Sequence, residues 1–150
     1  MPISNKIPAK DWTFEIDDGT DTDTFIEIKG IETFTPEPSS NRTDTTNNDS
    51  DGDDEGYISR RGLSLTLEGD YMEDVSDGSR DPGQERVEEA GQLTGQESVV
   101  PFKMTSPGGN VYEFDVTVDN ALPTGGSYEE NTAWEASLTK SGPTNKSTTT

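Results

Sequence analysis

The chain contains no cysteine and no histidine among its 150 residues. The first absence excludes disulfides, thiol chemistry and thiolate zinc sites, and the second removes the commonest acid–base and metal-binding side chain. The sequence also lacks a P-loop, a nucleotide-binding glycine motif and a nucleophile elbow. Carboxylate pairs such as Asp17 and Asp18 are frequent, but a chain this acidic produces them by composition alone. We therefore expect a protein that is not an enzyme, with no catalytic residue, cofactor or metal site.

Basic residues are also scarce, because 11 lysines and arginines face 31 aspartates and glutamates, for a formal net charge of −20. Such a surface repels DNA, RNA and anionic membranes, which argues against nucleic-acid binding through basic contacts. In dilute buffer the charge also destabilises the folded state, whereas at molar salt the Debye length falls to about 3 Å and the repulsion is screened. The composition therefore predicts a halophilic host; an ordinary acidic soluble protein is the alternative.

Apolar residues make up only 26% of the chain, and no apolar run is long enough to cross a bilayer. The first residues, "MPISNKIPAKDW", also lack the apolar segment of a signal peptide. We expect one domain with a lean core over residues 1–140, including an N-terminal arm at 1–11, followed by a flexible polar tail at 141–150.

Apolar and polar residues alternate in six segments, which is the period of a β-strand. In "DWTFEID", for example, Trp12, Phe14 and Ile16 share one face. The second segment is expected to end at Pro36 and Pro38, because proline cannot donate to a sheet ladder. The predicted strands lie within residues 11–17, 24–38, 61–72, 97–105, 110–120 and 132–140.

One helix is predicted between the third and fourth strands. Asp81 is suited to the N-cap and Pro82 to the first helical position, and apolar residues then recur every third position until Gly95. We expect the helix to run from Pro82 to Thr94 and to lie against the rim or one face of a sheet. The fold class is mainly β: an antiparallel β-sandwich or barrel with one flanking α-helix and a long loop between strands 2 and 3.

The long loop covers residues 37–57 and contains "NNDSDGDDEG" at 47–56. Its alternating aspartates and Gly52 match the start of an EF-hand calcium loop. However, Ile58 stands where the closing bidentate glutamate is required, and neither flank has helical periodicity. We therefore interpret the segment as an assembly loop that is disordered in the free subunit and becomes ordered on assembly.

The sequence "GYISRRG" at 56–62 brings two adjacent arginines to the end of this loop. Tyrosine and arginine are enriched at protein interfaces, and a guanidinium can pair with acidic neighbours. A local salt bridge is the alternative interpretation. The candidate inter-subunit contacts are Phe34, Arg42, Tyr57, Ile58, Arg60 and Arg61.

The predicted elements follow one another in this order: a short N-terminal arm, two strands, a long acidic loop, a strand, a helix, and three strands that end in "WEASLTKSG" at 134–142. This layout resembles the tail tube proteins of long-tailed, siphovirus-like viruses. The last strand running into "LTKSG" is similar to the final strand of that family, and residues 37–56 occupy the position of its long loop. The resemblance covers most of the chain but is one of layout, without an invariant motif.

The resemblance implies hexameric rings stacked into a hollow tube that conducts DNA into the host. An acidic lumen would let DNA slide through without specific binding. It further implies a location in the virion tail after synthesis in the host cytoplasm, no membrane contact, and partners that include other copies of the chain, the tape measure protein and the tail terminator. An extracellular or capsid-surface β-sandwich that binds calcium or carbohydrate is the alternative function.

Overall fold

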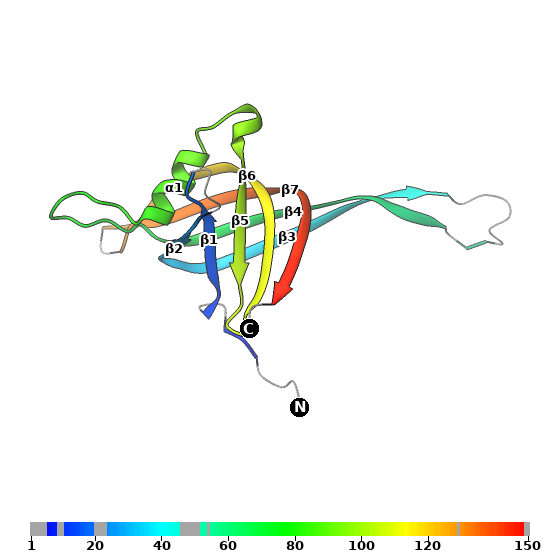
Figure 1. Ribbon diagram of the computed structural model, residues 1–150, viewed down its shortest axis with the longest axis horizontal. Helices are drawn as coiled ribbons and strands as arrows, with labels where there is room; N and C mark the ends of the chain where they lie inside the picture. Colours follow the sequence, from blue (N-terminus) through cyan, green and yellow to red (C-terminus); the bar gives the residue numbers. More distant parts are fainter. Residues whose placement is uncertain are drawn as a thin grey trace.

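The computed structural model of the chain describes residues 6–8, 11–19, 24–45, 52–53, 55–128 and 130–148. Its strands form a single antiparallel sheet in the order β2-β1-β5-β6-β7-β4-β3, beside a single α-helix (Figure 1). The predicted mainly β class with one helix is confirmed, although the described residues form seven strands where the sequence predicted six. The elements are β1 (Thr13–Asp17), β2 (Phe25–Ile28), β3 (Ile31–Asp44), β4 (Gly56–Asp70), α1 (Pro82–Ala90), the 3-10 helix η3 (Gly95–Ser98), β5 (Val99–Thr105), β6 (Asn110–Gly125) and β7 (Ala133–Thr148).

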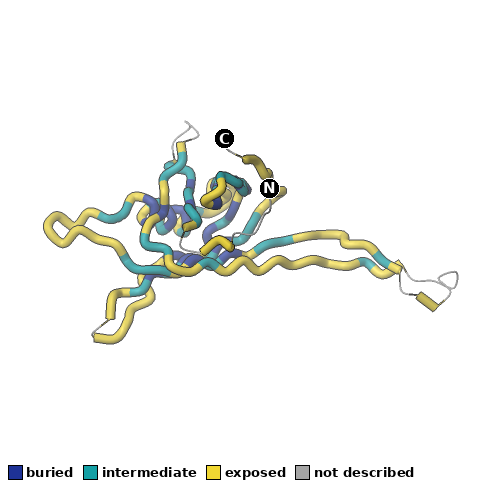
Figure 2. Tube along the Cα trace, turned by 90° about the horizontal axis from the view of Figure 1, so that it is seen from below, coloured by how far each residue is buried: buried dark blue, intermediate teal, exposed yellow. Residues whose placement is uncertain are grey.

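The sheet is rolled, so that strands near its two ends come together. Phe34 on β3 lies 5.0 Å from Phe14 on β1 and 5.5 Å from Trp12, measured between ring centroids. The turn between β2 and β3 also reaches β4, because Gly30 O accepts a hydrogen bond from Asp70 N at 2.9 Å. Rolling places the inward side chains of both ends in one core, which Figure 2 shows as the buried part of the body.

The core contains the apolar side chains that period-two alternation assigned to the inner face. Trp134, Ala136 and Leu138 of β7 are fully buried, as predicted, and Leu65 and Leu67 of β4 face them. The aromatic ring of Phe102 is also fully buried. The remaining buried apolar residues are Phe14, Ile16, Ile28, Val87, Ala90, Val100, Val111, Phe114, Val116, Val118 and Ala121.

Helix α1 begins where the sequence predicts and ends earlier. The Asp81 side chain accepts a hydrogen bond from Gln84 N at 3.1 Å, and Pro82 is the first helical residue. The helix stops at Ala90 with Gly91 as its C-cap, so the predicted end at Thr94 is wrong. Glycine is a poor helix former, and Gly91 ends the helix before the last residue of the apolar stripe, Leu93. No helix among the described residues is long and apolar enough to span a bilayer.

Gln84 fastens the helix to the sheet. Its side chain is fully buried, and its Nε2 donates to Lys29 O at 2.9 Å and to Asp70 O at 2.8 Å, while Oε1 accepts from Met72 N at 3.2 Å. The neighbouring Gly83 allows this close approach, since a Cβ atom there would lie 2.2 Å from Glu27 O. One amide thus joins α1, the β2–β3 turn and the end of β4.

The two prolines of β3 do not end that strand, which corrects the sequence prediction. β3 continues through Pro36 and Pro38 to Asp44, in register with β4. The prolines lie two residues apart and so place their nitrogens on the same side of the strand. β3 is the outermost strand and has β4 on one side only. The proline nitrogens can therefore face the other side, the open edge of the sheet, where no N–H donor is needed.

Much of the predicted loop at 37–57 is instead part of a β-hairpin arm, which the structure describes at residues 39–45 and 55–62 (Figure 1). Ser39–Asp44 of β3 pair with Gly56–Gly62 of β4, and Thr45 N donates to Glu55 O at 2.9 Å. Figure 2 shows the arm projecting from the body with its residues largely exposed. The prediction of an irregular loop is therefore wrong for these paired strands, whereas the segment at 47–56, for which disorder was predicted, lies mostly outside the described residues. The aspartates considered for calcium at 49 and 51 lie outside the described residues.

The predicted flexible tail is also largely strand, because β7 continues from Lys140 to Thr148. Thr148 pairs with Asn110 and Asn145 with Glu113 on β6. β4 pairs with β7 only from Ser64 to Asp70, so the arm and the second half of β7 diverge beyond that point. Within the described residues, each of these segments has a neighbouring strand on one side only. The predicted N-terminal arm at 1–11 lies mostly outside the described residues.

Candidate assembly interface

The arm has two faces, and each combines arginine with an exposed apolar or aromatic side chain. Directly paired residues share a face, so the pairs Asn41↔Arg60 and Thr43↔Tyr57 place Tyr57 and Arg60 together. The pairs Ser40↔Arg61 and Arg42↔Ile58 define the other face, with a bulge at Ser59 between the two sets. Tyr57 is 58% exposed and Ile58 is 41% exposed. Five of the six candidate contacts from the sequence are thus brought together: Arg42, Tyr57, Ile58, Arg60 and Arg61.

The arginines of the arm have polar neighbours but no acidic partner in the described part of the chain. With its amide oxygen facing the guanidinium, Asn41 accepts from Arg60 Nη2 at 2.6 Å and Nε at 3.2 Å. Arg42 lies over Gly56, where a Cβ atom would be 2.8 Å from Arg42 Nε. Among described residues, the salt bridges within 4.0 Å involve only the arginines of the body. The local salt bridge considered from the sequence does not form between described residues.

Arginines of the body, in contrast, are used internally. Arg80 pairs with Glu88, and Arg86 Nε donates to Asp17 O at 2.7 Å. Burial alone would lower the pKa of Arg80, but the hydrogen bond and charge of Glu88 outweigh burial and raise that pKa above its usual value. The two groups of arginines therefore differ in environment: those of the body are paired with carboxylates and backbone carbonyls, and those of the arm are exposed.

Phe34, the sixth candidate contact, lies apart from the arm. It is half-buried in the body, where it packs on Trp12 and Phe14. The structure thus places this side chain in the aromatic cluster that closes the rolled sheet.

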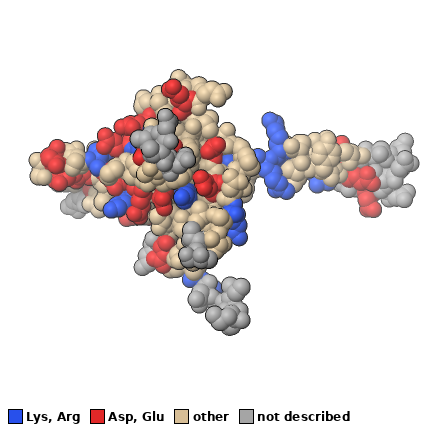
Figure 3. All heavy atoms as spheres, in the orientation of Figure 1, with Lys and Arg blue, Asp and Glu red and all other residues tan. Residues whose placement is uncertain are grey.

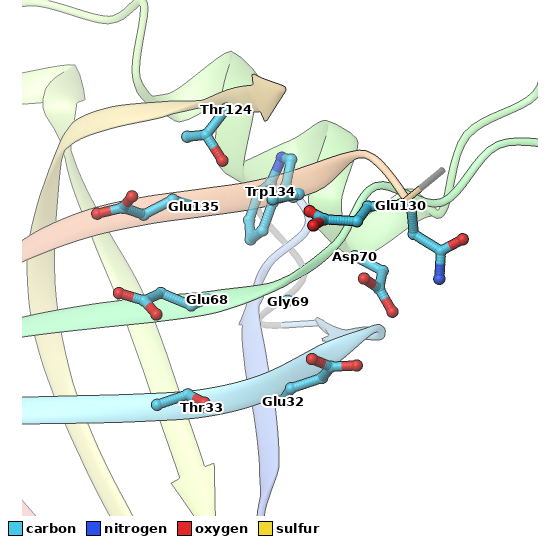
Figure 4. Close-up of a pocket in the computed structure, with 11 residues that line it drawn as sticks. Glu32, Thr33, Glu68, Gly69, Asp70, Thr124, Glu130, Trp134 and Glu135 are labelled. Atoms are coloured by element: carbon cyan, nitrogen blue, oxygen red, sulfur yellow. The ribbon is translucent and has the colours of Figure 1, made fainter. Parts of the chain in front are cut away.

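The outer face of the sheet carries an acidic groove that sequence analysis did not single out (Figure 4). The groove has a volume of about 650 Å³ and lies where β3, β4 and β7 run side by side. Glu68 of β4 and Glu135 of β7 are direct register partners and lie next to each other across the two strands. The acidic residues that line it are Glu32, Glu68, Asp70, Glu130 and Glu135. Strand alternation predicts that Glu68 and Glu135 face outward, but only the register shows that they meet.

Charge is distributed unevenly over the molecule. Figure 3 shows red carboxylates gathered on the body and blue basic side chains at the base of the arm. The described residues contain no group of three or more acidic side chains arranged to hold a metal ion. The body and the base of the arm therefore present surfaces of opposite charge to a neighbouring molecule.

A second exposed surface lies at the end of the body opposite the arm (Figure 1). The connection between β4 and α1 carries Val75, which is 93% exposed. Hydrogen bonds from the Ser76 side chain and backbone lower the pKa of Asp74, and those from the Ser79 backbone and side chain lower the pKa of Asp77. The connection is thus ordered by its own aspartates and holds an apolar residue in solvent.

Comparison with known proteins gives structural neighbours but no sequence relatives. No family model matches the chain, and no curated protein sequence matches it. A chain in the virion of a native gene transfer agent particle aligns with a TM-score of 0.72 at 16% identity, covering 95% of this chain and 99% of that chain. A chain in the tail of an empty gene transfer agent particle, determined with C6 symmetry, aligns with a TM-score of 0.70 at 17% identity, covering 97% of this chain and 100% of that chain.

A third neighbour comes from a contractile injection system. A chain in the sheath–tube complex of an extracellular contractile injection system aligns with a TM-score of 0.64 at 8% identity, covering 98% of this chain and 95% of that chain. At these identities the comparisons establish a shared fold along nearly the whole length of each chain.

Proposed function

We propose that this protein is a structural, non-enzymatic subunit of a phage-like tail, and more specifically a tail tube protein. The observation that carries the proposal is the end-to-end match of fold to chains from a sixfold-symmetric particle tail and from a sheath–tube complex. The exposed arm adds support, because a long hairpin with arginine and apolar side chains on both faces is suited to contacts between subunits.

In this function six subunits form a ring, rings stack through the arm, and DNA passes through the lumen. The net charge of −20 supports a lumen without a basic lining, so that DNA slides without specific binding. The protein would be made in the host cytoplasm and reside in the virion tail, in contact with the tape measure and tail terminator proteins. A siphovirus-like virus of a halophilic host accounts for both the layout and the acidity.

The purified protein is expected to form rings or tubes on its own. The exposed arm and the open strand edges are stabilised only when neighbouring subunits cover them. Electron microscopy of concentrated protein, from about 0.1 M to molar salt, tests this directly, and class averages of the end-on views give the symmetry. A protein that remains monomeric at every concentration and salt would contradict the proposed function.

The thermal midpoint is expected to fall when salt is lowered from molar to about 10 mM, where the Debye length reaches about 30 Å. Unscreened repulsion among the carboxylates of the body then destabilises the folded state. Differential scanning calorimetry across a sodium chloride series measures the midpoint. Sucrose serves as the control, because it strengthens apolar burial without screening charge. A midpoint that stays flat or rises as salt is removed would argue against adaptation to high salt.

A further inference from the structure

We propose that the arm of one copy docks in the acidic groove of a second copy, with one arginine of the arm, Arg60 or Arg61 according to the face of the hairpin that enters, lying between Glu68 and Glu135. The inference rests on the proposed function, because it requires that copies of the chain assemble. It goes further by naming the surface that receives the arm.

The arm offers cationic groups that form no salt bridge with any described carboxylate. Arg60 and Arg61 point to opposite faces of the hairpin, and no described carboxylate lies within 4.0 Å of either guanidinium. A guanidinium presents donors in a planar fork that matches a carboxylate. Tyr57 and Ile58 lie beside these arginines and supply apolar area that a partner would cover. The base of the arm is therefore complementary to an acidic surface.

The groove in turn contains two carboxylates without a cationic partner among the described residues. Glu68 and Glu135 are directly opposite on adjacent antiparallel strands, a placement that is unfavourable for like charges. Among the described residues, no lysine or arginine forms a salt bridge with either of them. A cation between the two carboxylates removes their repulsion. The groove is about 650 Å³ in volume, which leaves room for long side chains of the arm.

One copy cannot satisfy its own groove. Arg60 and Glu68 belong to the same strand, eight residues apart, which is about 27 Å of extended chain. The cation and the carboxylates therefore meet only between molecules. Because the arm and the groove are different surfaces, the contact is heterologous, and such contacts close into rings or continue as filaments. This is the contact geometry that a stacked tube requires.

A second copy also explains why arginines gather at the base of the arm. The chain carries only five arginines, and three of them are Arg42, Arg60 and Arg61. The acidic bodies of two copies repel each other when they pack side by side. The arginines at the base of the arm, placed between two such bodies, replace that repulsion with ion pairs. Pairs excluded from solvent are screened less than exposed charges, so the contact persists at high salt.

Charge reversal tests the contact. The arm variant Arg60→Glu/Arg61→Glu and the groove variant Glu68→Lys/Glu135→Lys are each expected to raise the critical concentration for assembly at least tenfold, measured by sedimentation. The variant with all four substitutions restores complementarity. It is expected to assemble with itself at a critical concentration within threefold of the wild type, and not to be incorporated into wild-type assemblies labelled with a second fluorophore.

Two control variants carry the same change in net charge at other exposed positions: Lys29→Glu/Lys146→Glu for the arm and Glu97→Lys/Asp115→Lys for the groove. Both are expected to assemble like the wild type, and circular dichroism verifies that each variant is folded. The docking inference is overturned if the arm and groove variants assemble as well as the wild type. It is also overturned if the fourfold variant does not regain a critical concentration near that of the wild type. In either case the proposed function stands, because the wild type assembles. If the wild type itself never assembles, both fail.

Discussion

Replacing residues 40–61 with an Asn-Gly turn is expected to leave the body folded and to abolish assembly. Ser39 and Gly62 are register partners, and Asn-Gly forms the two-residue turn that antiparallel strands favour. Every described residue that is removed is exposed, except for the few that are half-buried within the arm itself, so the core described above loses no apolar contact. The free energy of unfolding should therefore change little, whereas the surface proposed to join rings is removed completely.

Circular dichroism and calorimetry measure the fold of this truncated variant, and electron microscopy with sedimentation measures its assembly. A matched control shortens only the connection at 46–54 and keeps Arg42, Tyr57, Arg60 and Arg61 in place; we expect it to assemble. Normal tubes from the truncated variant would refute the role of the arm. Loss of folding would show that the arm contributes to the stability of the body.

The substitution Gln84→Ala is expected to destabilise the body by about 3 kcal/mol, because it leaves three backbone groups without their partner at roughly 1 kcal/mol each or more. These groups are Lys29 O, Asp70 O and Met72 N. For a domain of this size the loss corresponds to a fall of about 6–12 °C in the thermal midpoint.

Calorimetry of the monomeric variant measures this shift, at a protein concentration where no assembly occurs. Gln92→Ala is the matched control, because Gln92 is the same residue type just beyond the helix but is exposed. A surface substitution of this kind changes stability by less than about 0.5 kcal/mol. Equal midpoints for the two variants would show that the Gln84 amide does not hold the helix, the β2–β3 turn and β4 together.

Local patterns predicted the parts of the fold that depend on neighbouring residues in the sequence. Alternation identified the inward faces of β4 and β7, and Asp81 with Pro82 identified the start of α1. The ends of β3 and β7 were not predictable in this way. Whether Pro36 is tolerated depends on its strand being outermost in the sheet, which is a property of the topology and not of the segment.

The candidate interface was predictable to a similar extent. Basic residues are scarce in the sequence, which makes the adjacent Arg60 and Arg61 stand out as candidate contacts, and the structure brings them together with Tyr57 and Ile58 in one arm. The acidic groove was not predictable, because an isolated glutamate in each of two strands is ordinary in so acidic a chain. Only the register of β4 against β7 makes Glu68 and Glu135 neighbours.

Because β4 and β7 diverge, each of these strands has an unpaired edge beyond the divergence, which could pair with other chains. Bare strand edges invite irregular stacking of the amyloid type, most readily where the side chains are apolar and uncharged. Here the segment of β7 beyond Lys140 reads "SGPTNKST", with a glycine, a proline and a lysine and no large apolar residue. Such a segment nucleates fibres poorly. The polarity that makes this stretch resemble a loop in the sequence thus also protects the exposed edge of β7 against fibre formation.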